Sequence, residues 1–80
     1  MMVGNNFRIS VGDDSEHEDL TAEIYYEETF LAMLSQEHGF DHLQLEIFPN
    51  PNGEQWVFSF EEFLNVVDAA KQRLWELRIV

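Results

Sequence analysis

The stretch from Ser59 to Leu77 constrains the fold most, because its start signal, length and periodicity all indicate one amphipathic helix. Ser59 and Glu62 form a capping box, in which the hydroxyl accepts a hydrogen bond from an amide of the first turn and the carboxylate reaches back. Apolar residues follow at spacings that place them on one helical face: Phe60, Phe63, Leu64, Val67, Ala70, Leu74 and Leu77. The sequence predicts that this face is buried against the preceding segments.

A chain of 80 residues is expected to form a single domain with one small core, 1–80. Such a domain has little room for a deep catalytic cleft, which favours binding at the surface. The chain has no cysteine, which excludes disulfide bonds and cysteine-rich zinc sites and is typical of a reducing compartment. We find no signal-peptide pattern and no membrane-spanning run, so we expect a cytoplasmic protein.

The charge balance is strongly acidic, with 16 Asp and Glu against four Lys and Arg and a net charge of −12. Only Arg8 opposes the acids before Lys71, and the other two cations, Arg73 and Arg78, also lie in the last ten residues. Phosphate contacts require a basic patch, so direct binding to nucleic acid or to an anionic membrane is disfavoured. A basic protein is the natural partner.

Alternating apolar residues upstream of the helix predict β-strands. Phe7, Ile9 and Val11 give the first strand, after a loose start at residues 1–6. Leu43, Leu45 and Ile47 give the clearest one. Residues 49–53, PNPNG, predict a turn, and residues 55–58 are either an edge strand or an extended lead into the helix.

The stretch from Leu20 to Ser35 has two interpretations. As a hairpin, two strands flank Glu27 and Glu28, and pairing Tyr26 with Thr29 places Ile24 opposite Leu31 and Ala22 opposite Met33. Tyr25, Phe30, Leu34 and Glu23 then share the other face. As a helix, Ser15 and Glu18 would form a capping box and Gly39 would end it. The hairpin is favoured, although Glu-Glu is an unusual two-residue turn.

These elements predict an α+β fold: an antiparallel meander of four or five strands over residues 7–58, with one C-terminal helix over residues 59–78 packed on one face. The short connections require antiparallel neighbours. The sheet residues expected in the core are Leu20, Ala22, Ile24, Leu31, Met33, Leu43, Leu45 and Ile47.

The sequence shows no pattern that indicates catalysis or a cofactor. His38 and His42 lie near Glu37 and Asp41, but Gly39 interrupts any helix that would align the two imidazoles, so we expect no metal site. We find no nucleophile in a recognisable frame and no glycine-rich phosphate loop. We therefore expect a protein that is not an enzyme.

The candidate contact residues are acids near aromatic side chains on the expected outer sheet face, a composition typical of protein interfaces. Residues 12–19, GDDSEHED, are expected mainly as a solvated turn, and their acids join the candidate set. That set is Asp13, Asp14, Glu16, Glu23, Tyr25, Glu27, Glu28, Phe30 and Glu46. A homodimer would use the same outer-face residues.

The segments EIYYEETFLAMLSQE, LQLEIFP, WVFSFEEFL and AAKQRL, in this order, resemble small bacterial immunity proteins of polymorphic-toxin systems. Those antitoxins neutralise effectors delivered by contact-dependent inhibition or type VI secretion. The resemblance spans about residues 23–77 and assigns no residue, because these proteins share no universal motif. It implies a tight, non-catalytic inhibitor of a cognate toxin, often a basic nuclease. The alternatives are a nucleic-acid-mimic inhibitor and a structural or regulatory module.

Overall fold

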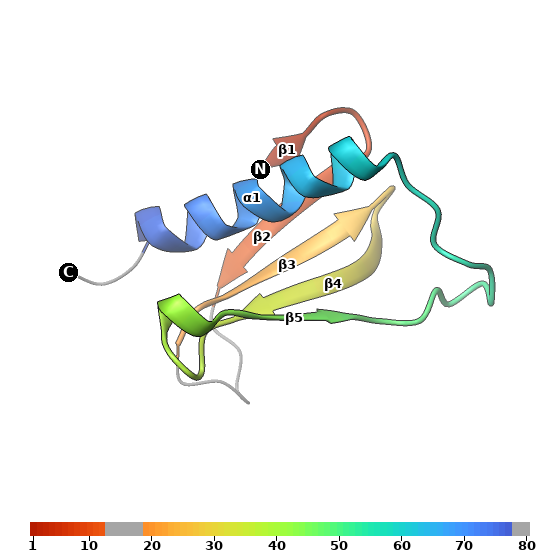
Figure 1. Ribbon diagram of the computed structural model, residues 1–80. Helices are drawn as coiled ribbons and strands as arrows, with labels where there is room; N and C mark the ends of the chain where they lie inside the picture. The colour runs from red at the N-terminus through yellow and green to blue at the C-terminus, as the bar shows by residue number, and fades with distance from the viewer. Residues whose placement is uncertain (13–18, 78–80) are drawn as a thin grey trace.

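The chain forms two layers, an antiparallel sheet of five strands and one long helix against one of its faces (Figure 1). The computed structural model describes residues 1–12 and 19–77. The strands, in chain order, are β1 Met2–Val3, β2 Phe7–Gly12, β3 Thr21–Tyr26, β4 Thr29–Ser35 and β5 Gln44–Ile47. A short 3₁₀ helix, η1 Phe40–His42, precedes β5, and α1 Phe60–Leu77 follows it. The predicted α+β meander is confirmed.

The sheet follows the chain order, because each strand pairs only with its neighbours in sequence among the described strands. Phe7 and Ile9 of β2 are buried toward α1, whereas Arg8 and Ser10 point to the other face. The start of the chain is more ordered than the pattern predicts. Val3 pairs with Phe7, and the Met1 amino group donates to the carbonyl of Ile9 at 3.0 Å, so the prediction of a loose segment over residues 1–6 is wrong.

The stretch from Leu20 to Ser35 contains the hairpin β3–β4, and the helical alternative is wrong. Tyr26 pairs with Thr29 as predicted, which leaves Glu27 and Glu28 as a two-residue turn. Both glutamates have positive φ, 48° and 66°, as a type I′ turn requires. This backbone matches the twist of the strands but is unfavourable for residues with a Cβ.

A β-bulge changes the register beyond the turn. Tyr25 pairs with Phe30, but Ile24 pairs with Ala32, so Leu31 is the extra residue. The predicted pairs of Ile24 with Leu31 and Ala22 with Met33 are therefore wrong. Leu34 lies opposite Ala22 and is buried on the helix side, and Met33 lies opposite Glu23 on the outer face.

The helix begins where the capping signal predicts, since the Ser59 hydroxyl accepts a hydrogen bond from the Glu62 amide at 3.4 Å. Its fully buried residues are Val66, Ala70 and Leu74. Three residues of the predicted buried face are exposed: Phe60 by 74%, Leu64 by 50% and Leu77 by 39%. The face is rotated from the prediction because α1 packs mainly on β1, β2 and β3.

The same offset exposes two sheet residues that were predicted to lie in the core, Leu45 and Ile47. Leu20 and Leu43 are half-buried at the margin of the core. Residues 55–58 form no strand and instead lead into the helix. Phe58 packs against Phe7, Tyr26 and Phe63, with ring centroids 4.8–5.6 Å apart.

None of the described residues forms a helix that is long and apolar enough to cross a membrane.

Candidate protein-binding surface

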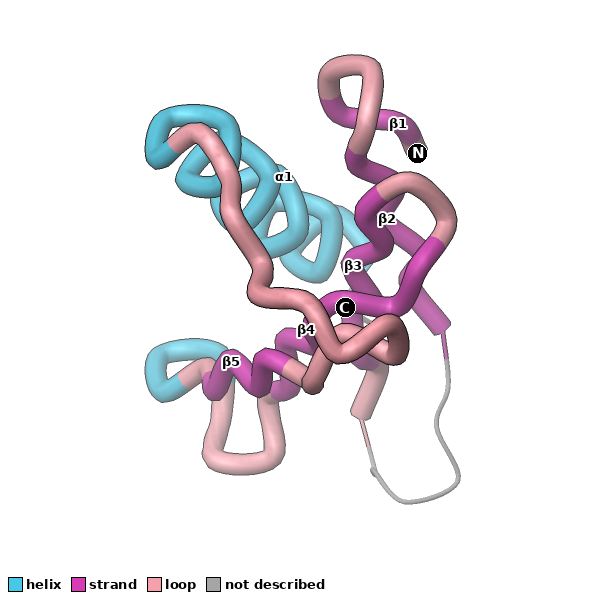
Figure 2. The backbone as a smooth tube through the Cα atoms, turned by 90° about the vertical axis from the view of Figure 1, so that its right-hand side faces the viewer, coloured by secondary structure: helices cyan, strands magenta, loops and turns pink. Residues whose placement is uncertain are grey.

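The outer face of the sheet, opposite α1, carries a row of contacting side chains that we call the aromatic strip: Arg8, Tyr25, Phe30 and Phe48. Figure 2 shows that no described helix lies on this side of the sheet. Arg8, Tyr25 and Phe30 are consecutive cross-strand partners from β2, β3 and β4. Phe48 directly follows β5, and its amide donates to the carbonyl of Leu31 at 2.8 Å, which extends the pairing.

Each member of the aromatic strip contacts the next. The guanidinium of Arg8 lies 4.2 Å from the centre of the Tyr25 ring, a cation–π contact. The Tyr25 and Phe30 centroids are 5.5 Å apart, and Phe30 stacks on Phe48 at 4.9 Å. All four side chains are half-buried, so each exposes part of its surface. The strip is therefore a continuous, partly apolar surface.

Carboxylates border the aromatic strip on two sides. Glu23 and Glu46 both lie opposite Met33, one on each neighbouring strand, so the three side chains form the adjacent row. Glu28, at the hairpin turn, accepts from Arg8 Nε at 3.1 Å. Acids thus stand beside the rings, and Arg8 is the one described cation on this face.

A hydrogen bond ties one of these acids to the aromatic strip. The hydroxyl of Tyr25 donates to Glu23 Oε1 at 3.1 Å. Burial raises the pKa of Tyr25, and this hydrogen bond and the Glu23 charge raise it further, against a smaller opposite effect of Arg8. The phenol therefore stays protonated at neutral pH and holds the Glu23 carboxylate in place.

The structure brings together most of the predicted contact residues. Glu23, Tyr25, Phe30 and Glu46 share the outer face, and Glu28 reaches it through Arg8. Glu27 is exposed at the turn, and its amide donates to the carbonyl of Asn6 at 2.8 Å. Asp13, Asp14 and Glu16 lie outside the described residues.

The sequence argument missed Arg8, a member of the aromatic strip. Arg8 alternates with Phe7 and Ile9, so the strand period alone places it on the outer face. Met33 is buried as predicted, with 7% of its surface exposed, but it faces the outer side of the sheet, because the sequence pattern does not reveal the bulge at Leu31. Leu34 was assigned to the outer face for the same reason.

A second hollow lies beside the hairpin tip, where Tyr26, Glu27 and Thr29 face Glu54 and Trp56 of the loop before α1. The Trp56 indole donates to the carbonyl of Phe48 at 2.8 Å and fixes this loop against the end of β5. Burial raises the pKa of Tyr26, with a further contribution from the Glu27 charge. Glu27 and Glu54 give the hollow an acidic lining.

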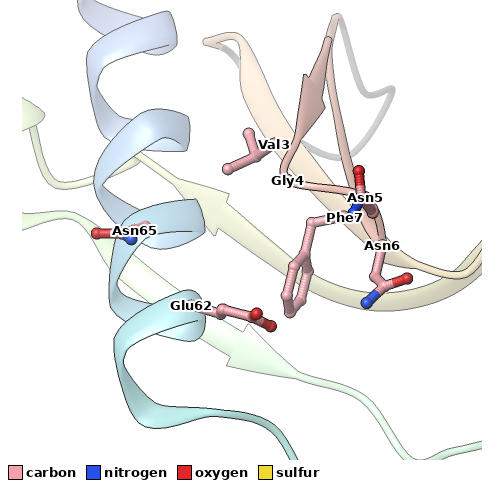
Figure 3. Close-up of a pocket in the computed structure, with 7 residues that line it drawn as sticks. All are labelled: Val3, Gly4, Asn5, Asn6, Phe7, Glu62 and Asn65. Atoms are coloured by element: carbon pink, nitrogen blue, oxygen red, sulfur yellow. The ribbon is translucent and has the colours of Figure 1, made fainter.

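A third hollow lies between the β1–β2 turn and the first turns of α1 (Figure 3). Glu62 and Asn65 line it from the helix, and Val3 and Phe7 line it from the sheet. Glu62 is the one titratable side chain in this lining, and the lining has no nucleophilic side chain.

The histidines do not form a metal site in the part of the chain that the structure describes. His38 is exposed just before Gly39, and His42 is exposed at the end of η1. Among residues 1–12 and 19–77, no group of three or more His, Cys, Asp or Glu residues could hold a metal ion.

Comparisons with known proteins identify no relative: no family model, curated protein or solved structure matches this chain.

Proposed function

We propose that this protein binds a cationic protein through its outer sheet face and blocks that protein's active surface, as an immunity protein blocks its toxin. The observation that carries the proposal is the aromatic strip bordered by Glu23, Glu28 and Glu46. Protein interfaces combine aromatic anchors with a charged rim, and the acidic rim selects a basic partner.

The net charge supports the same kind of partner. A charge of −12 attracts a cationic protein over distances up to the Debye length and repels nucleic acids that compete for the same basic surface. Electrostatic steering of this kind raises association rates from about 10⁶ to as much as about 10⁹ M⁻¹s⁻¹ at low salt. Fast capture suits an inhibitor that must act before its target causes damage.

The order of the aromatic strip supports tight binding. Tyr25 is held by Arg8 on one side, by Phe30 on the other and by its hydrogen bond to Glu23. Side chains that are already fixed lose little conformational entropy when a partner packs on them, at a saving of about 0.5–1.5 kcal/mol for each. A rigid sheet face is therefore a suitable platform for high affinity.

The hairpin turn gives a further argument. Glu27 and Glu28 hold left-handed backbone conformations that Asn and Gly adopt with less strain. Strained residues of this kind concentrate at functional sites, where the side chain matters more than local stability. We infer that both carboxylates contact the basic partner at the edge of the interface.

The test begins with the partner. The tagged chain is expressed in its source organism, the proteins that co-purify are identified by mass spectrometry, and the cationic candidate is purified. Association is then measured by stopped-flow fluorescence at several salt concentrations. We expect Glu23→Lys/Glu46→Lys to slow association at least about tenfold at low salt and to flatten its salt dependence.

The matched control is Glu62→Lys/Glu76→Lys, which changes the net charge by the same amount on the helix side facing β1. We expect it to slow association much less, because its charges lie away from the outer face. If both double variants slowed association equally, net charge alone would set the rate. That result would contradict the proposal of a binding site on the outer face. Inhibition of the purified partner's activity by the wild-type chain completes the test, and binding without inhibition would contradict the blocking role.

A further inference from the structure

The inner face of β5 stays exposed beside α1. α1 contacts β1, β2 and β3, and the views in Figures 1 and 2 place it away from β5. β4 is covered, since its inner-face residues Ala32 and Leu34 are buried, so the exposed apolar residues of this face lie on β5.

The sheet side of this space carries exposed apolar residues. Ile47 pairs with Ala32, and Leu45 pairs with Leu34, so both β5 side chains lie on the inner face, the face that α1 covers elsewhere. Leu45 is 38% exposed and Ile47 is 55% exposed. Glu46, between them, points to the outer face.

The helix side carries a matching apolar flank. Glu62 and Asn65 face β1, since both line the hollow beside the β1–β2 turn (Figure 3). The opposite flank faces β5, because the ring of Trp75 lies 5.1 Å from that of Phe40, just before β5. Leu64 precedes Trp75 by three helical turns and shares its flank.

Phe60 lies one further turn before Leu64 on this flank. Phe60 is 74% exposed, Leu64 50% and Trp75 45%. We call these three residues, with Leu45 and Ile47, the inner patch. Single exposed apolar residues are ordinary, but five on one flank of α1 and on the strand beside it, β5, mark a docking surface.

The charges around the inner patch select its occupant. Glu61 and Asp68 lie three and four residues from Leu64 on the exposed side of α1. Asp41 of η1 is exposed near Trp75, and Lys71, 5.9 Å from the Phe40 ring, is the one described cation on this flank. A second copy of this chain would bring another −12 charge to this acidic rim, so self-association is disfavoured.

We propose that the inner patch binds a basic amphipathic helix of a partner protein, which lies beside α1 and covers the exposed inner face of β5. The apolar side of that helix packs on Leu45, Ile47 and Leu64, and its Lys or Arg residues pair with Glu61 and Asp68. Helix-in-groove recognition uses this combination of apolar anchors and charge. The inference goes beyond the proposed function, because it concerns the opposite face of the sheet.

The probe is a synthetic peptide of about 15 residues, long enough for about 22 Å of helix, with Leu on one face and Lys on the other. Its control has the same composition in a scrambled order that forms no apolar face. We expect calorimetry to give micromolar binding of the amphipathic peptide and at least about tenfold weaker binding of the scrambled one. Amide NMR shifts are expected at Leu45, Ile47, Leu64 and Trp75.

Variants test the site itself. Ile47→Thr/Leu64→Asn keeps the net charge and is expected to weaken peptide binding at least about tenfold. Asp68→Lys is expected to weaken binding more than Glu76→Lys, its charge-matched control on the flank that faces β1. Glu23→Gln on the outer face is expected to change the affinity less than about twofold, which separates this result from the test of the proposed function.

Three results would overturn the inference: equal binding of the scrambled peptide, NMR shifts confined to the outer face, or a dimer in analytical ultracentrifugation that Ile47→Thr/Leu64→Asn converts to a monomer. The last result would mean that a second copy covers the inner patch.

Discussion

Two glutamates occupy turn positions where a type I′ hairpin prefers Asn followed by Gly. The sequence predicted the hairpin from the flanking strands, and the turn residues themselves argued against it. Tertiary contacts explain why it forms: Glu27 donates from its amide to Asn6, and Glu28 pairs with Arg8. Local propensity here is outweighed by strand pairing on both sides.

Replacing the turn by Glu27→Asn/Glu28→Gly should stabilise the fold. The change relieves left-handed strain of about 1–3 kcal/mol and removes an exposed ion pair worth about 0–1 kcal/mol. We expect the free energy of unfolding, measured by urea denaturation, to rise by about 1–2 kcal/mol. The control Glu27→Ala/Glu28→Ala removes the same charges and keeps the strained backbone. An equal gain in the control would assign the effect to charge.

Tyr25 should make the stability sensitive to high pH. Burial first, and then the hydrogen bond to Glu23, raise its pKa in the folded chain above the unfolded value of about 10. A raised pKa means that the folded state holds the proton more tightly, so the contribution is complete below about pH 10 and is lost as the pH rises through the folded pKa. We expect Tyr25→Phe to lose less stability than the wild type between about pH 8 and pH 11.

The measurement is the urea concentration at the midpoint of unfolding, at about pH 8 and at about pH 11. Tyr26 also has a raised pKa, so Tyr25→Phe should retain part of the alkaline loss. Identical alkaline losses in Tyr25→Phe and the wild type would show that the Tyr25 hydroxyl contributes nothing to this pH dependence.

At the scale of elements, the sequence predicted which segments form strands and where the helix begins, but two face assignments were wrong. The bulge at Leu31 moved Met33 outward and Leu34 inward, since one extra residue reverses every later side chain. The helical face was rotated because periodicity identifies an apolar stripe and does not say which strands lie under it. Val66, absent from the predicted stripe, is fully buried, whereas Phe60 is exposed.

This rotation predicts opposite results for two large apolar residues of α1. Leu74→Ala removes a fully buried side chain and should cost about 2–5 kcal/mol of unfolding free energy. Phe60→Ala, at a residue that is 74% exposed, should change it by less than about 0.5 kcal/mol. Chemical denaturation of both variants is the test. A larger loss for Phe60→Ala than for Leu74→Ala would mean that the packed face of the helix is misassigned.

At the scale of the whole molecule, the two faces of the sheet differ in how they were predicted. The outer face followed from strand alternation and the turn, so Glu23, Tyr25, Phe30 and Glu46 were placed together correctly. The inner patch was not predicted, because the number of strands that one helix covers depends on its position over the sheet. Both faces present apolar side chains beside acids, which is a consequence of the uniformly acidic composition.

The acidic composition also predicts how salt acts on stability. A net charge of −12 on 80 residues repels itself more in the compact state than in the expanded unfolded chain. Raising NaCl from about 10 mM to about 500 mM shortens the Debye length from about 30 Å to about 4 Å, so the repulsion is screened and the unfolding free energy should rise by about 1 kcal/mol or more. Thermal unfolding at both salt concentrations measures this. Glu62→Lys/Glu76→Lys reduces the magnitude of the negative net charge by four and should show a smaller gain. An equal gain would assign the effect to salting-out of apolar surface instead of charge repulsion.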